Sequence, residues 1–64
     1  MKTLTKTINN TLFTLTLDDL KVELQRDGKQ VRFEECESEK LAQLNYEGCA
    51  SLLEDGEFSL KYFN

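Results

Sequence analysis

Hydrophobic and polar residues alternate along the first 35 positions of the chain, in short stretches that are interrupted by pairs of turn-forming residues. The pairs are Asn9-Asn10, Asp18-Asp19 and Asp27-Gly28, and consecutive pairs are nine residues apart. A period of two is typical of strands with one buried face. Asn, Asp and Gly also tolerate the positive φ that two-residue hairpin loops require. The spacing therefore predicts a four-stranded antiparallel β-meander.

The three turns also predict which residues lie opposite one another. If each pair forms a two-residue loop, opposing residue numbers sum to 19, 37 and 55 across the successive turns. One face then carries most large apolar residues and ends in Glu35; the apolar members are Leu4, Ile8, Phe13, Leu15, Leu17, Leu20, Val22, Leu24, Val31 and Phe33. The other face is polar except for Leu12. It brings Lys21 opposite Glu34 and Glu23 opposite Arg32, in pairs worth about 0.2–1 kcal/mol each.

A competing interpretation makes residues 18–26 a short helix. Leu17, Leu20 and Leu24 also lie at helical spacing, and Gly28 is a suitable residue to follow a helix end. In that arrangement the second and third strands would lose their pairing. For a short apolar segment, periodicity alone does not distinguish a strand from a helix.

After Glu35 the apolar period changes to about 3.6, which predicts an amphipathic helix that covers the apolar face of the sheet. Ser38 is a good N-cap and Gly56 a good residue just past the helix end. The apolar stripe comprises Leu41, Leu44, Gly48 and Leu52, widened by Ala42, Cys49 and Leu53. Glycine in mid-helix costs about 1 kcal/mol relative to alanine. Gly48 therefore indicates close packing on the sheet or, alternatively, a break near Asn45.

The last residues alternate again and predict a fifth strand from Glu57 to Phe63, with Phe58, Leu60 and Tyr62 on one side. We expect it antiparallel beside the first strand, because antiparallel neighbours are the commoner kind; the alternative is parallel beside the fourth. The predicted fold class is α+β, in the order ββββαβ. Residues 1–64 are expected to form a single domain.

Composition and charge limit the classes of function. The 64 residues include 12 acidic and 8 basic side chains and no histidine, giving a net charge of −4. This balance argues against direct nucleic acid binding and against binding to anionic membranes. No apolar run resembles a signal peptide or a membrane span, so we expect a cytoplasmic protein.

The sequence does not indicate an enzyme. It has no histidine, no glycine-rich phosphate loop and no metal-ligand spacing, so we expect no catalytic residues, no cofactor and no metal. Cys36 and Cys49 do not match a zinc pattern, because zinc sites use closely spaced ligand pairs. They are expected to be free thiols, with Cys49 a small buried hydrophobe.

Acidic residues near and on the predicted helix are the candidate site. The predicted partner-binding residues are Glu35, Glu37, Glu39, Glu47, Glu54, Asp55 and Glu57. They suggest a small acidic protein-binding module, an inhibitor or regulator of the type that phages and mobile elements encode. It would block a basic surface of a partner protein, for example one that binds nucleic acid. The alternative is that these acids form an ordinary solvated helix face. The acids on the helix are about 10–12 Å apart along its axis, whereas phosphates in a nucleic-acid strand repeat every ~3.4 Å, so the helix imitates nucleic acid poorly.

A second hypothesis is a self-assembling structural subunit. Five threonines surround Leu12 on the polar sheet face: Thr3, Thr5, Thr7, Thr14 and Thr16. This flat uncharged surface, or an open sheet edge, could form a homodimer. Threonine is also simply a good strand residue.

Overall fold

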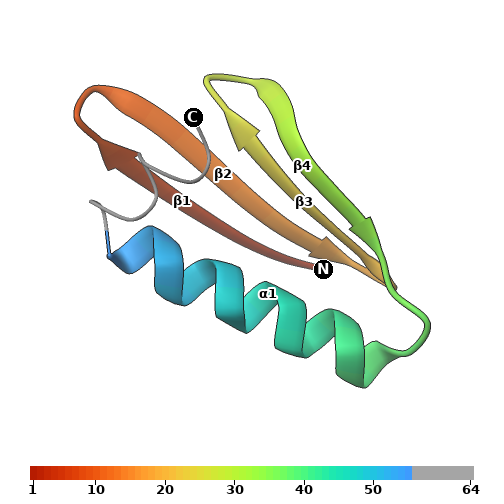
Figure 1. The fold of residues 1–64 in the computed structure, drawn as a ribbon. Helices are drawn as coiled ribbons and strands as arrows, with labels where there is room; N and C mark the ends of the chain where they lie inside the picture. Colours follow the sequence, from red (N-terminus) through yellow and green to blue (C-terminus); the bar gives the residue numbers. More distant parts are fainter. Residues whose placement is uncertain (56–64) are drawn as a thin grey trace.

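The computed structural model describes residues 1–55 as a four-stranded sheet with one helix across one of its faces (Figure 1). The elements are β1 (Lys2–Ile8), β2 (Thr11–Asp18), β3 (Lys21–Arg26), β4 (Lys29–Glu35) and α1 (Glu39–Glu54). The strands are antiparallel neighbours in the order β1-β2-β3-β4. The predicted meander and helix are therefore confirmed, and the competing helix over residues 18–26 is wrong.

Three predictions lie outside the described residues: the strand from Glu57 to Phe63, the helix stop at Gly56 and the partner-binding role of Glu57. Within residues 1–55, no helix combines the length and the apolar character needed to cross a membrane.

The first hairpin has the predicted register, and its loop chemistry explains why. Asn9 and Asn10 have φ values of 49° and 64°, the left-handed conformation that two-residue loops require. Every β1 residue from Lys2 to Ile8 then faces its expected partner on β2.

The second hairpin is displaced by two residues from the predicted register. Leu15 lies opposite Leu24, and Asp18 closes β2 opposite Lys21, so the loop is Asp19-Leu20. Asp19, with φ of 57°, is the loop residue with a positive φ. The displacement also brings the opposite charges of Asp18 and Lys21 together. Because it is an even number of residues, each side chain keeps its predicted face.

The third hairpin begins in the predicted register and then changes it. Asp27 and Gly28 form the loop, with φ values of 51° and 83°, and Gln25 pairs with Gln30 as expected. The next pair is Leu24 with Arg32, so Val31 is an extra residue that forms a β-bulge.

The bulge exchanges the two faces of the rest of β4. Phe33 lies opposite Glu23 and Glu35 opposite Lys21, on the face away from α1 rather than on the predicted core face. The predicted pairs of Lys21 with Glu34 and Glu23 with Arg32 do not form. Arg32 instead forms an ion pair with Glu34 at 3.8 Å.

The position of the helix explains why apolar burial does not impose the predicted register on β4. Helix α1 lies mainly over β2, with further contacts to β3 and β1. β4 lies at the edge of the sheet and has less contact with α1 than β1, β2 or β3 has (Figure 1). A strand without a strongly buried face has a weakly specified register, so local pairing decides which residues of β4 face the helix.

The core lies between α1 and the first three strands. It consists of Phe13, Leu15, Val22, Leu24, Ala42, Cys49 and Leu53. The helix begins as predicted, with the Leu41 N–H donating to Ser38 Oγ at 3.2 Å. The Cys49 prediction is also confirmed, because this residue is buried against the sheet.

The prediction of which helix residues face the centre of the sheet is wrong. Leu41 and Leu44 are 50% and 55% exposed, because α1 is turned so that the smaller Ala42 and Cys49 face the sheet. A hydrogen bond also joins β1 to α1, because Lys2 Nζ donates to Gln43 Oε1 at 3.2 Å.

Gly48 serves neither purpose that the sequence suggested. A Cβ atom at this position would meet nothing within 4 Å, so glycine is not needed for a close approach to the sheet. The helix is also continuous past Asn45. The structure does not explain the choice of glycine at position 48.

Candidate functional site

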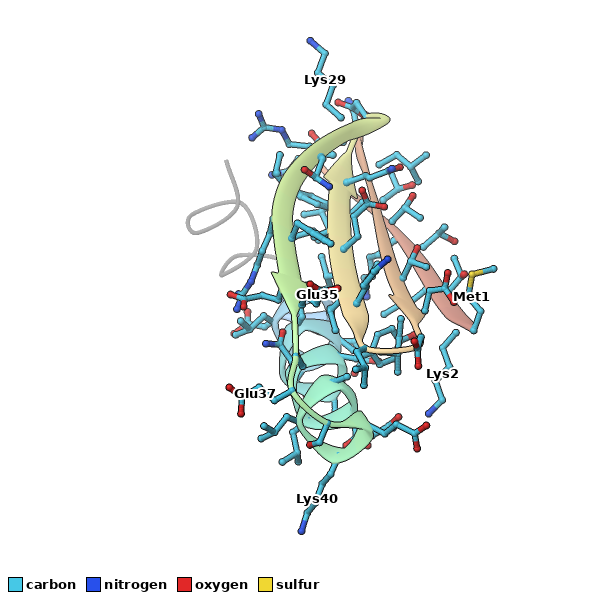
Figure 2. The ribbon with its side chains drawn as sticks, turned by 90° about the vertical axis from the view of Figure 1, so that its right-hand side faces the viewer. Met1, Lys2, Lys29, Glu35, Glu37 and Lys40 are labelled. Atoms are coloured by element: carbon cyan, nitrogen blue, oxygen red, sulfur yellow. The ribbon has the colours of Figure 1, made fainter. Side chains whose placement is uncertain are left out.

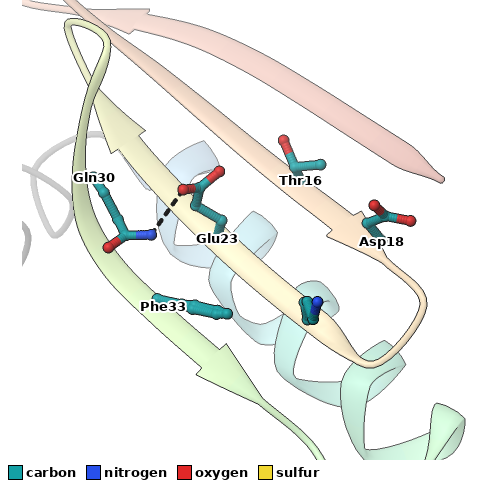
Figure 3. Close-up of a pocket in the computed structure, with 6 residues that line it drawn as sticks. Thr16, Asp18, Glu23, Gln30 and Phe33 are labelled. Atoms are coloured by element: carbon teal, nitrogen blue, oxygen red, sulfur yellow. Dashed lines mark hydrogen bonds between the residues drawn. The ribbon is translucent and has the colours of Figure 1, made fainter.

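The face of the sheet away from α1, which we call the outer face, contains an open cleft of about 530 Å³ (Figure 3). This outer cleft spans β2, β3 and β4 and is lined by Thr16, Asp18, Lys21, Glu23, Gln30 and Phe33. It exists in this form because the bulge at Val31 places Phe33 on the outer face. The Phe33 side chain is 44% exposed and supplies the aromatic wall.

The Glu23 carboxylate is held in place by two side-chain amides. Gln30 Nε2 donates to Glu23 Oε2 at 2.8 Å, and Gln25 Nε2 donates to Glu23 Oε1 at 3.3 Å. A carboxylate has about four lone-pair positions, so Glu23 can accept further hydrogen bonds from a ligand. The amides orient this anion without neutralising its charge.

A second group of carboxylates lies at the end of the sheet where the β2–β3 turn meets the β4–α1 connection (Figure 1). We call this group the acidic end; its members are Asp18, Asp19, Glu35, Glu37 and Glu39. Figure 2 shows Glu35 at the end of β4 and Glu37 on the connection to α1. The Cys36 N–H donates to the Leu20 carbonyl oxygen at 2.8 Å and ties the two segments together.

The carboxylates of the acidic end are open to solvent. All five residues are exposed. Among residues 1–55, none of them forms an ion pair; the ion pair in this part of the chain joins Arg32 to Glu34. The acidic end adjoins the outer cleft, because Asp18 belongs to both and Glu35 lies opposite Lys21.

The predicted site residues fall into two groups. Glu35, Glu37 and Glu39 belong to the acidic end. Three others are exposed farther along the helix and at its end: Glu47, Glu54 and Asp55. Glu39 and Glu54 are about 22 Å apart along the axis of α1. Glu57 lies outside the described residues.

Several residues of this region were not among the predicted site residues. Asp18 and Asp19 were assigned to a loop, and Glu23 was assigned to an ion pair with Arg32. Their charge was visible in the sequence, but the bulge that releases Glu23 and exposes Phe33 was not. The two glutamines opposite each other, Gln25 and Gln30, were the available signal for a polar cluster around Glu23.

The threonine surface occupies the other half of the outer face. Thr3, Thr5 and Thr7 are exposed on β1, and Leu12 is an exposed apolar residue beside them. β1 is an edge strand, but Lys2 and Lys6 lie on its helix-facing side. Inward-pointing charges of this kind discourage pairing between sheet edges.

The surroundings of the two cysteines indicate structural roles. Both are free thiols, Cys36 half-buried and Cys49 buried. Burial raises the pKa of the Cys49 thiol, and the nearby Arg32 charge only partly opposes this effect. Cys49 is therefore protonated at neutral pH and acts as a small core residue. Within residues 1–55, no group of three potential metal-ligating side chains is placed to hold a metal ion.

Within residues 1–55, the geometry thus defines a small acidic α+β domain with a sheet that a helix covers on one face and leaves open on the other. Comparisons with protein-family models, with curated proteins and with solved structures find no match.

Proposed function

We propose that the protein is an acidic protein-binding module, an inhibitor or regulator that occupies a basic surface of a partner protein. The observation that carries the proposal is the acidic end, where exposed carboxylates from the β2–β3 turn, the end of β4 and the start of α1 lie at the same end of the sheet and form no ion pair among residues 1–55. Complementary charge accelerates association and selects the partner and its orientation.

The charge of the chain indicates the kind of partner. With a net charge of −4, the protein is attracted to basic surfaces. A surface that normally binds nucleic acid has the required charge. By occupying such a surface, the module would block it, which is the simplest regulatory action open to a protein of this size.

A double charge reversal tests the proposal. We expect Glu35→Lys with Glu37→Lys to weaken partner binding by at least about ten-fold, since like charges across an interface cost several kcal/mol. The partner would be captured from a lysate of the source organism and purified, and its dissociation constant measured at about 0.1 M and 1 M salt. Wild-type binding should weaken steeply at the higher salt, where the Debye length falls from about 10 Å to about 3 Å.

The matched control is Glu47→Lys with Glu54→Lys, which changes the net charge equally but leaves the acidic end intact. We expect this control to retain most of the affinity. Equal losses in the two double variants would show that only net charge matters and would contradict a specific acidic interface. Binding that is insensitive to salt would also contradict the proposal.

A further inference from the structure

The bulge in β4 gives the outer cleft an aromatic surface beside an anion. Val31 is the extra residue, and its insertion turns Phe33 onto the outer face directly opposite Glu23. Bulges often re-aim a side chain in this way next to functional sites. In a continuous ladder Phe33 would face the helix side, and the cleft would lose its aromatic wall.

Among the carboxylates in and beside the cleft, Glu23 has no cation directly opposite it on a neighbouring strand, although Lys21 lies two residues away on the same face of β3. Lys21 lies opposite Asp18 on one side and opposite Glu35 on the other. Glu23, by contrast, lies opposite Thr16 and Phe33, and its hydrogen-bond donors are the neutral amides of Gln25 and Gln30. Asp18 and Glu23 supply two negative charges to the cleft lining and Lys21 one positive charge, so the cleft has a net negative charge next to an exposed aromatic ring.

We propose that the outer cleft receives one arginine side chain of the partner protein, stacked on Phe33 and hydrogen-bonded to Glu23. Arginine fits better than lysine, because its planar guanidinium can stack on an aromatic ring while its edge donates to a carboxylate. This inference rests on the proposed function and narrows the partner's basic surface to one that presents an arginine. The adjoining carboxylates Asp18 and Glu35 strengthen the attraction.

The experiment is an NMR titration of the ¹⁵N-labelled full chain with N-acetyl-arginine amide, N-acetyl-lysine amide and N-acetyl-citrulline amide. The citrulline compound has nearly the shape of arginine without its charge. We expect arginine to shift the amide signals of Phe33, Glu23 and the Gln30 side chain at lower concentrations than lysine does, and citrulline to leave them unchanged.

Two variants assign the response to the cleft. Phe33→Ala should weaken arginine binding by about two- to five-fold, the value of a cation–π contact at an exposed site, and Glu23→Gln should weaken it at least as much. Leu12→Ala, which removes another exposed apolar side chain of the outer face, should leave the affinity unchanged. Unchanged affinity in Phe33→Ala, an equal response to citrulline, or tighter lysine binding would overturn the inference.

The partner itself separates this inference from the proposed function. If Phe33→Ala binds the purified partner normally while the double reversal of Glu35 and Glu37 abolishes binding, the acidic interface stands and the arginine-receiving cleft is wrong. If neither change affects partner binding, both proposals fail.

Discussion

Replacing Phe13 with alanine is expected to destabilise the domain by about 3–5 kcal/mol, the usual cost of truncating a buried phenylalanine. Phe13 is 0% exposed and belongs to the core between β2 and α1. A chain of this length has a total stability of roughly 3–10 kcal/mol. The variant should therefore be partly or largely unfolded at room temperature, as measured by circular dichroism during urea denaturation.

Phe33→Ala is the matched control for this prediction. It removes the same side chain from the outer face, where the ring is 44% exposed, and we expect it to change the free energy of unfolding by less than about 1 kcal/mol. Similar losses in the two variants would mean that both rings are buried and that the outer face is not open.

The second large effect is expected on the helix. Leu53→Ala should cost about 2–5 kcal/mol, because Leu53 is 0% exposed and fills the core from the last turn of α1. Leu44→Ala should change the stability by no more than about 0.5 kcal/mol, since Leu44 is 55% exposed and alanine favours the helix. Urea midpoints of the two variants give the comparison.

The opposite order of effects would show that α1 rests on the sheet through Leu44. This arrangement is the one that the apolar stripe of the sequence predicts, so the pair of variants distinguishes the sequence pattern from the observed helix orientation.

The first half of the fold was predictable because local chemistry and pattern agree there. The positive φ values of Asn9, Asn10, Asp27 and Gly28 are conformations that these residue types tolerate. Ser38 likewise begins α1 as its hydroxyl predicts. The pair Asp18-Asp19 was less informative, because two adjacent aspartates do not determine which residues form the loop.

The orientation of α1 and the register of β4 could not be read from periodicity. A helix with Leu41, Leu44, Leu52 and Leu53 has a broad apolar surface, and contact with the sheet decides which part is buried. β4 has apolar Val31 and Phe33 among charged residues, so a single bulge exchanges its faces at little cost. Of the candidate site, the charges of Glu35, Glu37 and Glu39 were predictable, whereas the partnership of Glu23 with Phe33 was not.

The bulge at Val31 turns Phe33 onto the outer face and so builds the outer cleft beside the acidic end. Cross-strand backbone NOEs between β3 and β4 test it most directly. We expect contacts that place Glu23 opposite Phe33 and Val22 opposite Glu34. Contacts that place Glu23 opposite Arg32 and Val22 opposite Phe33 would show a continuous ladder, with Phe33 facing the helix side, and would contradict the account.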